Sequence, residues 1–243
     1  MFDLEFETGA KVRMRYAPGA KALPTVLVVP GWGSDVLGSS TYGAVAESLL
    51  SAGYHCCLLV FRRWHGPTRH TGKATWHDHL QDIKKAYAWL TDNERVDATR
   101  MCGFGTSHGG FLLAKLLNEL PMQLLALRAP ALYADDRIPD ARSPEYMEDA
   151  EYWEWCSSVR AREDSSVLNA INTYTGKLLI VVSECDEQVP RTVMQSYGLA
   201  ASEARLVEEV VIPGAFHGLS GKPREDFLDI MKQWFIEQYP SST

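Results

Sequence analysis

The chain has 243 residues, a length that suits one domain of ordinary size. Hydrophobic residues make up 46% of it and charged residues 23%, the balance of a globular protein rather than a disordered or membrane-spanning one. The net charge of -7 argues against nucleic acid or an anionic membrane surface as a partner, because both attract basic proteins. No apolar run reaches the length of a membrane span.

The N-terminus and the cysteines indicate the compartment. Residues 1–7 (MFDLEFE) contain neither the basic nor the apolar segment of an export signal, so we expect no leader peptide. The five cysteines are odd in number and lack a repeating spacing, which is a poor basis for a disulfide framework. We therefore expect reduced thiols and a cytoplasmic protein.

Strand-like and helix-like segments alternate along the chain. Short alternating pieces in residues 1–22 predict a meander at a sheet edge. The apolar runs that follow are typical of parallel strands covered on both faces, and their alternation with helices favours a mainly parallel sheet between two helical layers. We predict strands at 25–29, 55–61, 99–104, 124–129, 178–182 and 206–212, and helices at 41–52, 75–90, 109–120, 190–202 and 223–238.

Residues 130–175 interrupt this alternation with a stretch rich in charged and aromatic residues. The stretch is too long for a plain crossover, and long insertions in compact domains are usually functional. We expect two or three short helices that form a small cap over the site, with an ordinary surface excursion as the alternative. Residues 1–243 would then form one domain with a cap insertion.

The sequence Gly105-Thr106-Ser107-His108-Gly109 has the G-x-S-x-G pattern, which is weak by itself. Here it directly follows an apolar strand and opens an apolar helix, the context in which a nucleophilic serine sits on a sharp turn between small residues. The helix N-terminus adds positive potential where an oxyanion forms. We predict that Ser107 is a nucleophile; the alternative is a glycine-rich turn with a helix-capping serine.

With this motif the chain resembles the α/β-hydrolases, and more closely their small single-domain members, grouped with dienelactone-hydrolase-like, serine-aminopeptidase-like and prolyl-oligopeptidase-like proteins. The resemblance covers nearly everything from Thr25 to the end. It implies the α/β-hydrolase fold, with a mostly parallel sheet of the eight-stranded type, helices on both faces and a small helical cap. It also implies that an acid and a histidine follow the serine, each on a loop after a later strand.

The loop after strand 178–182 resembles the family's acid loop, in which an Asp precedes Val-Pro, and Asp186 matches that position. A plain loop or capping role is the alternative for this residue. Two longer neighbours, Glu184 and Glu187, are expected to be solvated surface carboxylates. The alternative acids, which follow the preceding strand, are Asp135 and Asp136.

His217, followed by Gly218 just after strand 206–212, looks like the family's catalytic histidine. The other six histidines fit this position less well. His77 and His79 alternate on a predicted helix and therefore point apart, and no further ligand cluster has suitable spacing. We expect neither a metal nor a cofactor.

The resemblance assigns the oxyanion hole to two backbone N–H groups. One belongs to His108, which follows the nucleophile, and the other to Trp32, in the turn Pro30-Gly31-Trp32-Gly33. The family usually carries His-Gly here, so Pro30 removes a histidine side chain that often steadies this loop. A packed Trp in a strand-ending turn is the other interpretation of Trp32, and both can hold together.

Residues 62–70 (RRWHGPTRH) form a basic run in the loop where the family commonly has Asp first. This run could bind an acidic group of the substrate or pair with Asp135, Asp136 and other cap carboxylates. We favour ion pairing, because most such charges are part of the surface structure.

These residues predict acyl transfer through a serine triad. A free serine hydroxyl is a poor nucleophile, so His217 would remove its proton while Asp186 fixes the imidazole tautomer. The leading hypothesis is hydrolysis of a small-molecule carboxylic ester or thioester through an acyl-Ser107 intermediate. A peptidase, an amidase or an acyltransferase would use the same triad. A non-catalytic α/β-hydrolase scaffold that acts as a binding module is the alternative from another class.

Overall fold

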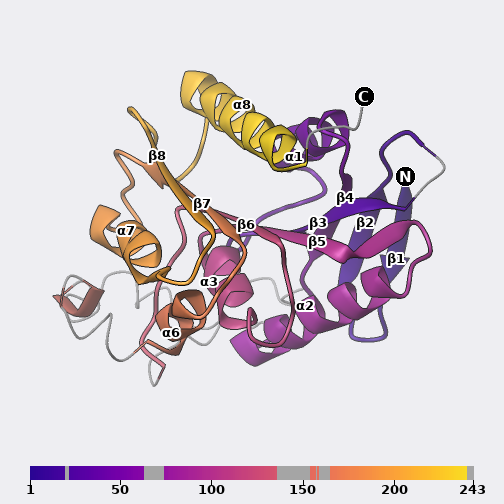
Figure 1. Cartoon of the computed structure of the whole chain (residues 1–243), viewed down its shortest axis with the longest axis horizontal. Coiled ribbons are helices and arrows are strands. Elements are labelled where there is room, and N and C mark those ends of the chain that lie inside the picture. The colour runs from indigo at the N-terminus through magenta and orange to yellow at the C-terminus, as the bar shows by residue number, and fades with distance from the viewer. Residues whose placement is uncertain (20–21, 63–73, 136–153, 157, 159–164, 240–243) are drawn as a thin grey trace, which may run out of the picture.

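The computed structural model describes residues 1–19, 22–62, 74–135, 154–156, 158 and 165–239 (Figure 1). The strands are β1 (Phe2–Glu5), β2 (Lys11–Arg15), β3 (Leu23–Val29), β4 (His55–Val60), β5 (Val96–Thr106), β6 (Leu124–Arg128), β7 (Lys177–Ser183) and β8 (Leu206–Ile212). The helices are α1 (Ser40–Ser51), α2 (Trp76–Thr91), α3 (His108–Lys115), α6 (Ser166–Asn172), α7 (Arg191–Ala200) and α8 (Gly221–Gln238).

The strands form one eight-stranded sheet in the order β1-β2-β4-β3-β5-β6-β7-β8. The pairs β1–β2 and β2–β4 are antiparallel, and all others are parallel. The antiparallel edge is the meander predicted for the first residues. The fold class is therefore confirmed: this is the α/β-hydrolase sheet, in which the carboxyl ends of the parallel strands share one edge.

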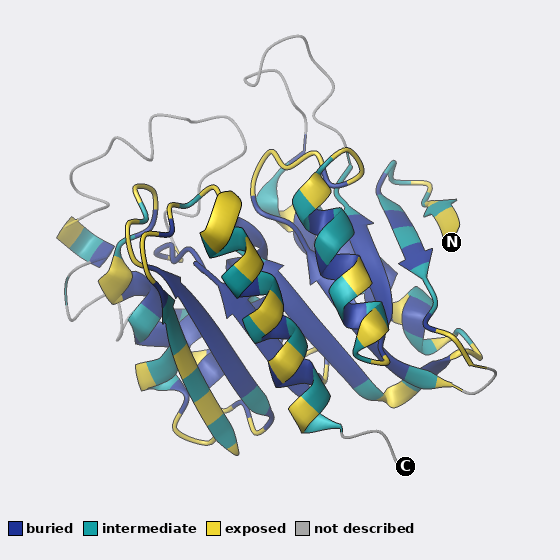
Figure 2. Cartoon of the chain, turned by 90° about the horizontal axis from the view of Figure 1, so that it is seen from above, coloured by how far each residue is buried: buried dark blue, intermediate teal, exposed yellow. Residues whose placement is uncertain are grey.

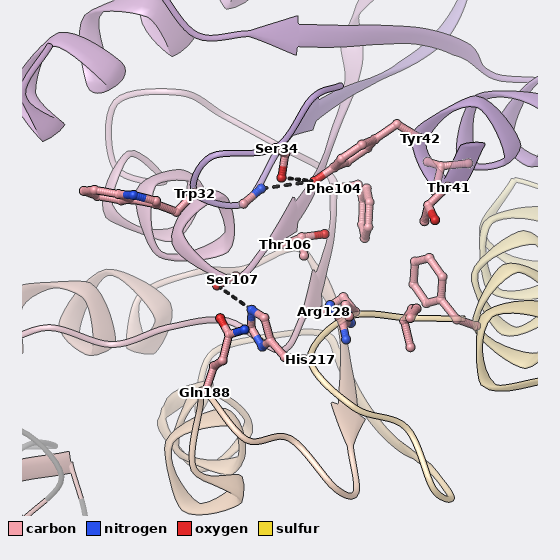
Figure 3. Close-up of a pocket in the computed structure, with 15 residues that line it drawn as sticks. Trp32, Ser34, Thr41, Tyr42, Phe104, Thr106, Ser107, Arg128, Gln188 and His217 are labelled. Atoms are coloured by element: carbon pink, nitrogen blue, oxygen red, sulfur yellow. Dashed lines mark hydrogen bonds between the residues drawn. The ribbon is translucent and has the colours of Figure 1, made fainter. Parts of the chain in front are cut away.

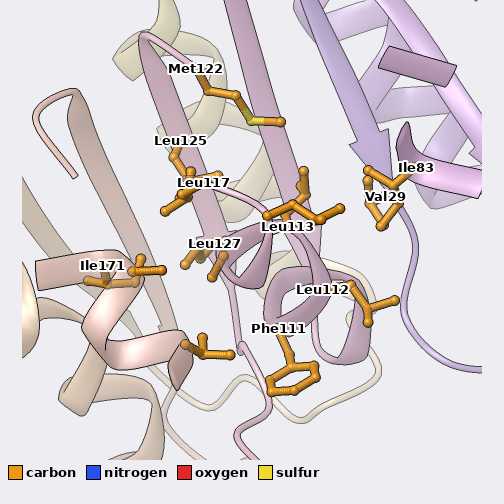
Figure 4. Packing of buried hydrophobic residues seen from close by; sticks show 14 of the residues in the cluster. Val29, Ile83, Phe111, Leu112, Leu113, Leu117, Met122, Leu125, Leu127 and Ile171 are labelled. Atoms are coloured by element: carbon orange, nitrogen blue, oxygen red, sulfur yellow. The ribbon is translucent and has the colours of Figure 1, made fainter. Parts of the chain in front are cut away.

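Helices cover both faces of the sheet. The pair α1 and α8 lies on one face, and α2, α3, α6 and α7 lie on the other (Figures 1 and 2). Each face has its own apolar cluster. In the larger cluster Phe111 and Leu113 of α3, Leu127 of β6 and Ile171 of α6 are all fully buried (Figure 4). The central strands are buried on both sides for this reason, whereas the edge strand β8 is only partly covered.

Local signals set most helix boundaries. The Ser39 side chain caps α1, and Thr75 forms a capping box with Asp78 at the start of α2. By contrast, α3 ends at Lys115 rather than at the predicted Leu120. The next N–H groups bond to carbonyl oxygens only three residues earlier, which tightens the chain into turns beyond the α-helix.

Most of the predicted cap and basic loop lies outside the described residues. Of the cap (130–175), residues 136–153, 157 and 159–164 are not described, and neither are residues 63–73. Within the described part, α6 packs its buried face against the larger cluster. Across all the residues that the structure describes, no helix is long and apolar enough to cross a bilayer.

Candidate active site

Ser107 occupies the sharp turn between β5 and α3, with φ 52° and ψ −122°. Among the described residues, it and Ala129 are the non-glycine residues with positive φ. Strain of this kind persists only where the surroundings hold it, and it clusters at functional sites. The turn depends on close packing: a Cβ on Gly109 would collide with the carbonyl oxygens of Val29 and Pro30. The sharp turn predicted at Ser107 is thus present, and the neighbouring backbone leaves no space for a side chain at Gly109.

The structure brings the three predicted side chains together at the carboxyl edge of the sheet. His217 Nε2 lies 3.1 Å from Ser107 Oγ (Figure 3), and His217 Nδ1 lies 2.9 Å from both carboxylate oxygens of Asp186. The serine follows β5, the carboxylate follows β7 and the imidazole follows β8. A hydroxyl, an imidazole and a carboxylate therefore form one hydrogen-bonded chain.

The Asp186 carboxylate is held in its ionised form. Its side chain is 1% exposed, and Oδ1 also accepts the N–H groups of Gln188 at 2.9 Å and Val189 at 2.8 Å. Burial raises the pKa of Asp186, but the hydrogen bond and charge of His217 and the two N–H donors outweigh it, so the pKa lies below its usual value. An ionised carboxylate can fix the imidazole with its proton on Nδ1.

The neighbouring glutamates are exposed, as predicted, but they do more than face solvent. Glu184 Oε2 accepts the N–H of Gly214 at 2.8 Å, and Glu187 Oε2 accepts the N–H of His217 at 3.0 Å. Both carboxylates therefore hold the loop that carries the imidazole. The alternative acid Asp135 instead bonds to Lys115 Nζ and Ser166, and Asp136 lies outside the described residues.

The turn after β3 is held by a residue that the sequence analysis missed. The N–H of Gly31 donates to Tyr42 Oη at 3.1 Å, and Ser34 Oγ lies 3.5 Å from the same oxygen. Tyr42 of α1 thus supports the loop in which Pro30 replaces the family's histidine. The Trp32 ring contacts the His108 ring edge-on, with 4.7 Å between centroids, so the two predicted oxyanion residues are neighbours.

Two buried histidines next to this turn act as aromatic groups. His79 and His108 are almost fully buried, and neither ring nitrogen of either residue has a hydrogen-bond partner among the described residues. Burial lowers the pKa of His79 to about 4 and that of His108 well below its ordinary value, so both rings are neutral at pH 7. His79 stacks on Phe61, with 4.1 Å between centroids.

Arg62, the described residue of the basic run, forms ion pairs as predicted, but the partners predicted for it were wrong. The Arg62 guanidinium bonds to Asp78 at 2.8 Å and to Asp82 through Nε at 3.0 Å. Both carboxylates come from the first turns of α2, which starts next to the end of β4. The predicted partner Asp135 is engaged by Lys115. The rest of the basic run lies outside the described residues.

A pocket of about 290 Å³ opens beside Ser107 and His217, on the side of the sheet covered by α1 and α8 (Figure 3). Its volume is at the small end for ligand sites, which suits a small molecule. Arg128, at the end of β6, was not predicted as a site residue, although a charged residue that ends an otherwise apolar strand is a signal in the sequence. Side chains from four elements line the pocket, among them Thr41, Tyr42, Phe104, Arg128 and Phe227.

Fold and comparisons together define the class of the protein: it has the α/β-hydrolase fold. A model of the prolyl oligopeptidase family matches residues 64–241, so the chain belongs to that family. This agrees with one of the three groups that the sequence resembles.

Curated relatives share about a quarter of their residues with the chain. Acylamino-acid-releasing enzyme 2 of Oryza sativa subsp. japonica is 25% identical over 232 residues, which cover 87% of this chain and 30% of that protein. An uncharacterised protein of Mycobacterium tuberculosis is 25% identical over 195 residues, covering 80% of this chain and 63% of that protein. The chain therefore spans less than two thirds of the length of these relatives.

Solved structures share the fold over nearly the whole chain. Est1E from Butyrivibrio proteoclasticus, solved with ferulic acid, has a TM-score of 0.70 at 20% identity and covers 95% of this chain and 96% of its own. The Pyrococcus furiosus esterase Pf2001 has a TM-score of 0.68 at 21% identity, with 98% and 91% covered. At this level of identity the similarity concerns the fold.

Proposed function

We propose that the protein hydrolyses a small carboxylic ester or thioester through an acyl-Ser107 intermediate. The observation that carries this proposal is the continuous chain from Ser107 Oγ through His217 to Asp186, with links of 3.1 and 2.9 Å. As Ser107 attacks the ester carbonyl, His217 Nε2 takes its proton and then passes it to the leaving alcohol or thiol. Water attacks the acyl-enzyme in the same way and restores the serine.

The proposed oxyanion hole consists of the backbone N–H groups of His108 and Trp32. Such donors stabilise the negative charge that develops on the carbonyl oxygen in the transition state. Tyr42, which accepts the N–H of Gly31, would hold the second donor in position. The positive end of α3 adds favourable potential at the same point.

Two observations favour an ester of a small molecule. The pocket beside Ser107 measures about 290 Å³, at the small end for ligand sites, which favours a small-molecule substrate. Proteins that share the fold include the esterases Est1E and Pf2001. A second candidate is cleavage of an acylated amino acid from a peptide, which the family match and the rice acylamino-acid-releasing enzyme favour.

Labelling with a fluorophosphonate and a substrate series tests the proposal. Wild type and Ser107→Ala would be treated with the probe and assayed on 4-nitrophenyl esters of increasing acyl length and on N-acetyl-alanine 4-nitroanilide. We expect labelling of the wild type only, with higher kcat/KM for short esters than for the anilide. A folded wild type without label, or full activity of Ser107→Ala, would refute the mechanism. Preference for the anilide would favour the peptidase.

A further inference from the structure

Arg128 is a buried cation next to the proposed nucleophile. It ends β6, is 4% exposed, and its carbonyl oxygen accepts the N–H of Ser107 at 3.0 Å. Its position in the strand puts its side chain on the same face as Ala126, the face covered by α1 and α8. The side chain lines the pocket together with Ser107 and His217 (Figure 3).

The guanidinium is only partly satisfied by the protein. Nη2 donates to Ser183 Oγ and to the Phe216 carbonyl oxygen, both at 2.9 Å. Nε is buried and has no hydrogen-bond partner among the residues that the structure describes. Arg128 forms no ion pair with a carboxylate in the described part of the chain. The charges of Asp186 and Glu187 act on it, but both carboxylates are bonded to His217.

An unpaired buried charge is expensive. Removing an arginine from water costs several kcal/mol, and buried charges are therefore normally paired. Burial lowers the pKa of Arg128, yet a guanidinium stays protonated at neutral pH because its ordinary pKa is so high. A positive charge with one unpartnered N–H donor, Nε, in the described part of the chain thus lies beside a small pocket in a protein whose net charge is -7.

We propose that Arg128 binds a carboxylate of the substrate, so that the enzyme acts on small esters that carry a free carboxylate, such as half-esters of short dicarboxylic acids. A carboxylate matches both the charge and the hydrogen-bonding geometry of a guanidinium. Phe104, Val45 and Phe227 give the same pocket apolar walls for the intervening methylene groups. This inference rests on the proposed hydrolysis at Ser107.

Arg128 also has a structural role, because its hydrogen bonds reach Ser183 and Phe216, which adjoin the loops that carry Asp186 and His217. Loss of those bonds would lower activity on every substrate. Selectivity therefore has to be read from the ratio of kcat/KM for charged and neutral esters of the same size. A purely structural side chain leaves that ratio unchanged.

The test compares 4-nitrophenyl hemiglutarate with 4-nitrophenyl valerate. It also compares 4-acetoxybenzoate with 4-methylphenyl acetate, which places the carboxylate on the alcohol side. Wild type is expected to prefer the charged member of at least one pair. A charged hydrogen bond of this kind corresponds to a difference of about 10- to 100-fold in kcat/KM between the charged and the neutral ester. Arg128→Met should lower the ratio by about the same factor, through KM, while Arg128→Lys keeps part of it. The control Arg100→Gln removes an equal charge, paired with Asp97, outside the pocket and should leave the ratio unchanged.

The outcomes separate this inference from the proposed function. Hydrolysis of the neutral esters without preference for either charged one, or an equal ratio in wild type and Arg128→Met, overturns the carboxylate site alone. No hydrolysis and no fluorophosphonate labelling overturns the proposed function and, with it, this inference. If Arg128→Met does not fold, inhibition of the wild type decides. Glutaramate, which differs from valeramide by a carboxylate in place of the terminal methyl group, must compete with 4-nitrophenyl valerate at least about tenfold better than valeramide does, and equal inhibition refutes the site.

Discussion

Replacing Asp186 by Asn tests the proposed acid most directly. The carboxylate accepts three groups, the imidazole of His217 and the N–H groups of Gln188 and Val189. An Asn side chain has a single acceptor oxygen, which the two backbone N–H groups require. Its NH2 group would then face His217 Nδ1, which must become an acceptor. The imidazole proton moves to Nε2, opposite Ser107 Oγ, where the histidine can no longer act as a base.

The size of the effect follows from this tautomer change. Loss of the correct tautomer costs about 10³- to 10⁴-fold in kcat, which is about 4–5.5 kcal/mol at 1.36 kcal/mol per decade. The fold should persist, because Asn has the shape of Asp and the side chain is 1% exposed. Turnover of 4-nitrophenyl butyrate at pH 7.5, with circular dichroism to verify folding, measures the change.

The matched control is Asp135→Asn, at the alternative acid position. Asp135 is bonded to Lys115 and Ser166 rather than to His217, so its loss should change kcat by no more than about threefold. If Asp186→Asn kept wild-type turnover while Asp135→Asn lost it, the acid would follow β6 and the reasoning from hydrogen bonds would be refuted.

Three further predictions concern the surroundings of the site. Tyr42→Phe leaves the N–H of Gly31 without its acceptor, so we expect a loss of about 1–3 kcal/mol in urea unfolding and a roughly tenfold drop in kcat; unchanged values in both would show that Tyr42 does not support the loop. Gly109→Ala drives a Cβ into two carbonyl oxygens and should abolish folding as seen by circular dichroism, whereas Gly43→Ala, with open space around it, should fold normally. Burial depresses the pKa of His79 to about 4 in the folded protein. As the pH falls, this imidazole is therefore protonated in the unfolded chain before it is protonated in the folded one. The free energy of unfolding should therefore fall by up to about 3 kcal/mol between pH 7 and 4, and His79→Phe should flatten this slope relative to wild type.

Much of the fold and of the candidate site could be predicted from local patterns. Continuous apolar runs identified the parallel strands, and the glycines around Ser107 identified the turn. The carboxyl ends of parallel strands meet at one edge, so loops after β5, β7 and β8 had to lie near one another. Asp186 and His217 were selected because their loops resemble the family's acid and histidine loops, and this constraint explains why such loops can converge.

Contacts between distant segments escaped prediction. Arg62 was assigned partners in the cap, but α2 supplies them, because its capped first turns start next to the end of β4. The support that Tyr42 gives to Gly31 depends on how α1 packs against the turn after β3. The last turn predicted for α3 was lost to tighter bonding after Lys115. None of these follows from periodicity, which reports only the face that an element buries.

The sequence by itself determined the order of strands and helices, the nucleophile turn and the candidates for acid and base, because each of these depends on residues adjacent along the chain. Tertiary structure decided which polar groups meet. Arg128 illustrates the difference: its partners lie 55 and 88 residues away, and only the packed sheet shows that its charge is buried with no carboxylate bonded to it in the described part of the chain. Burial and pairing are properties of the surroundings, and those surroundings exist only once the chain has folded.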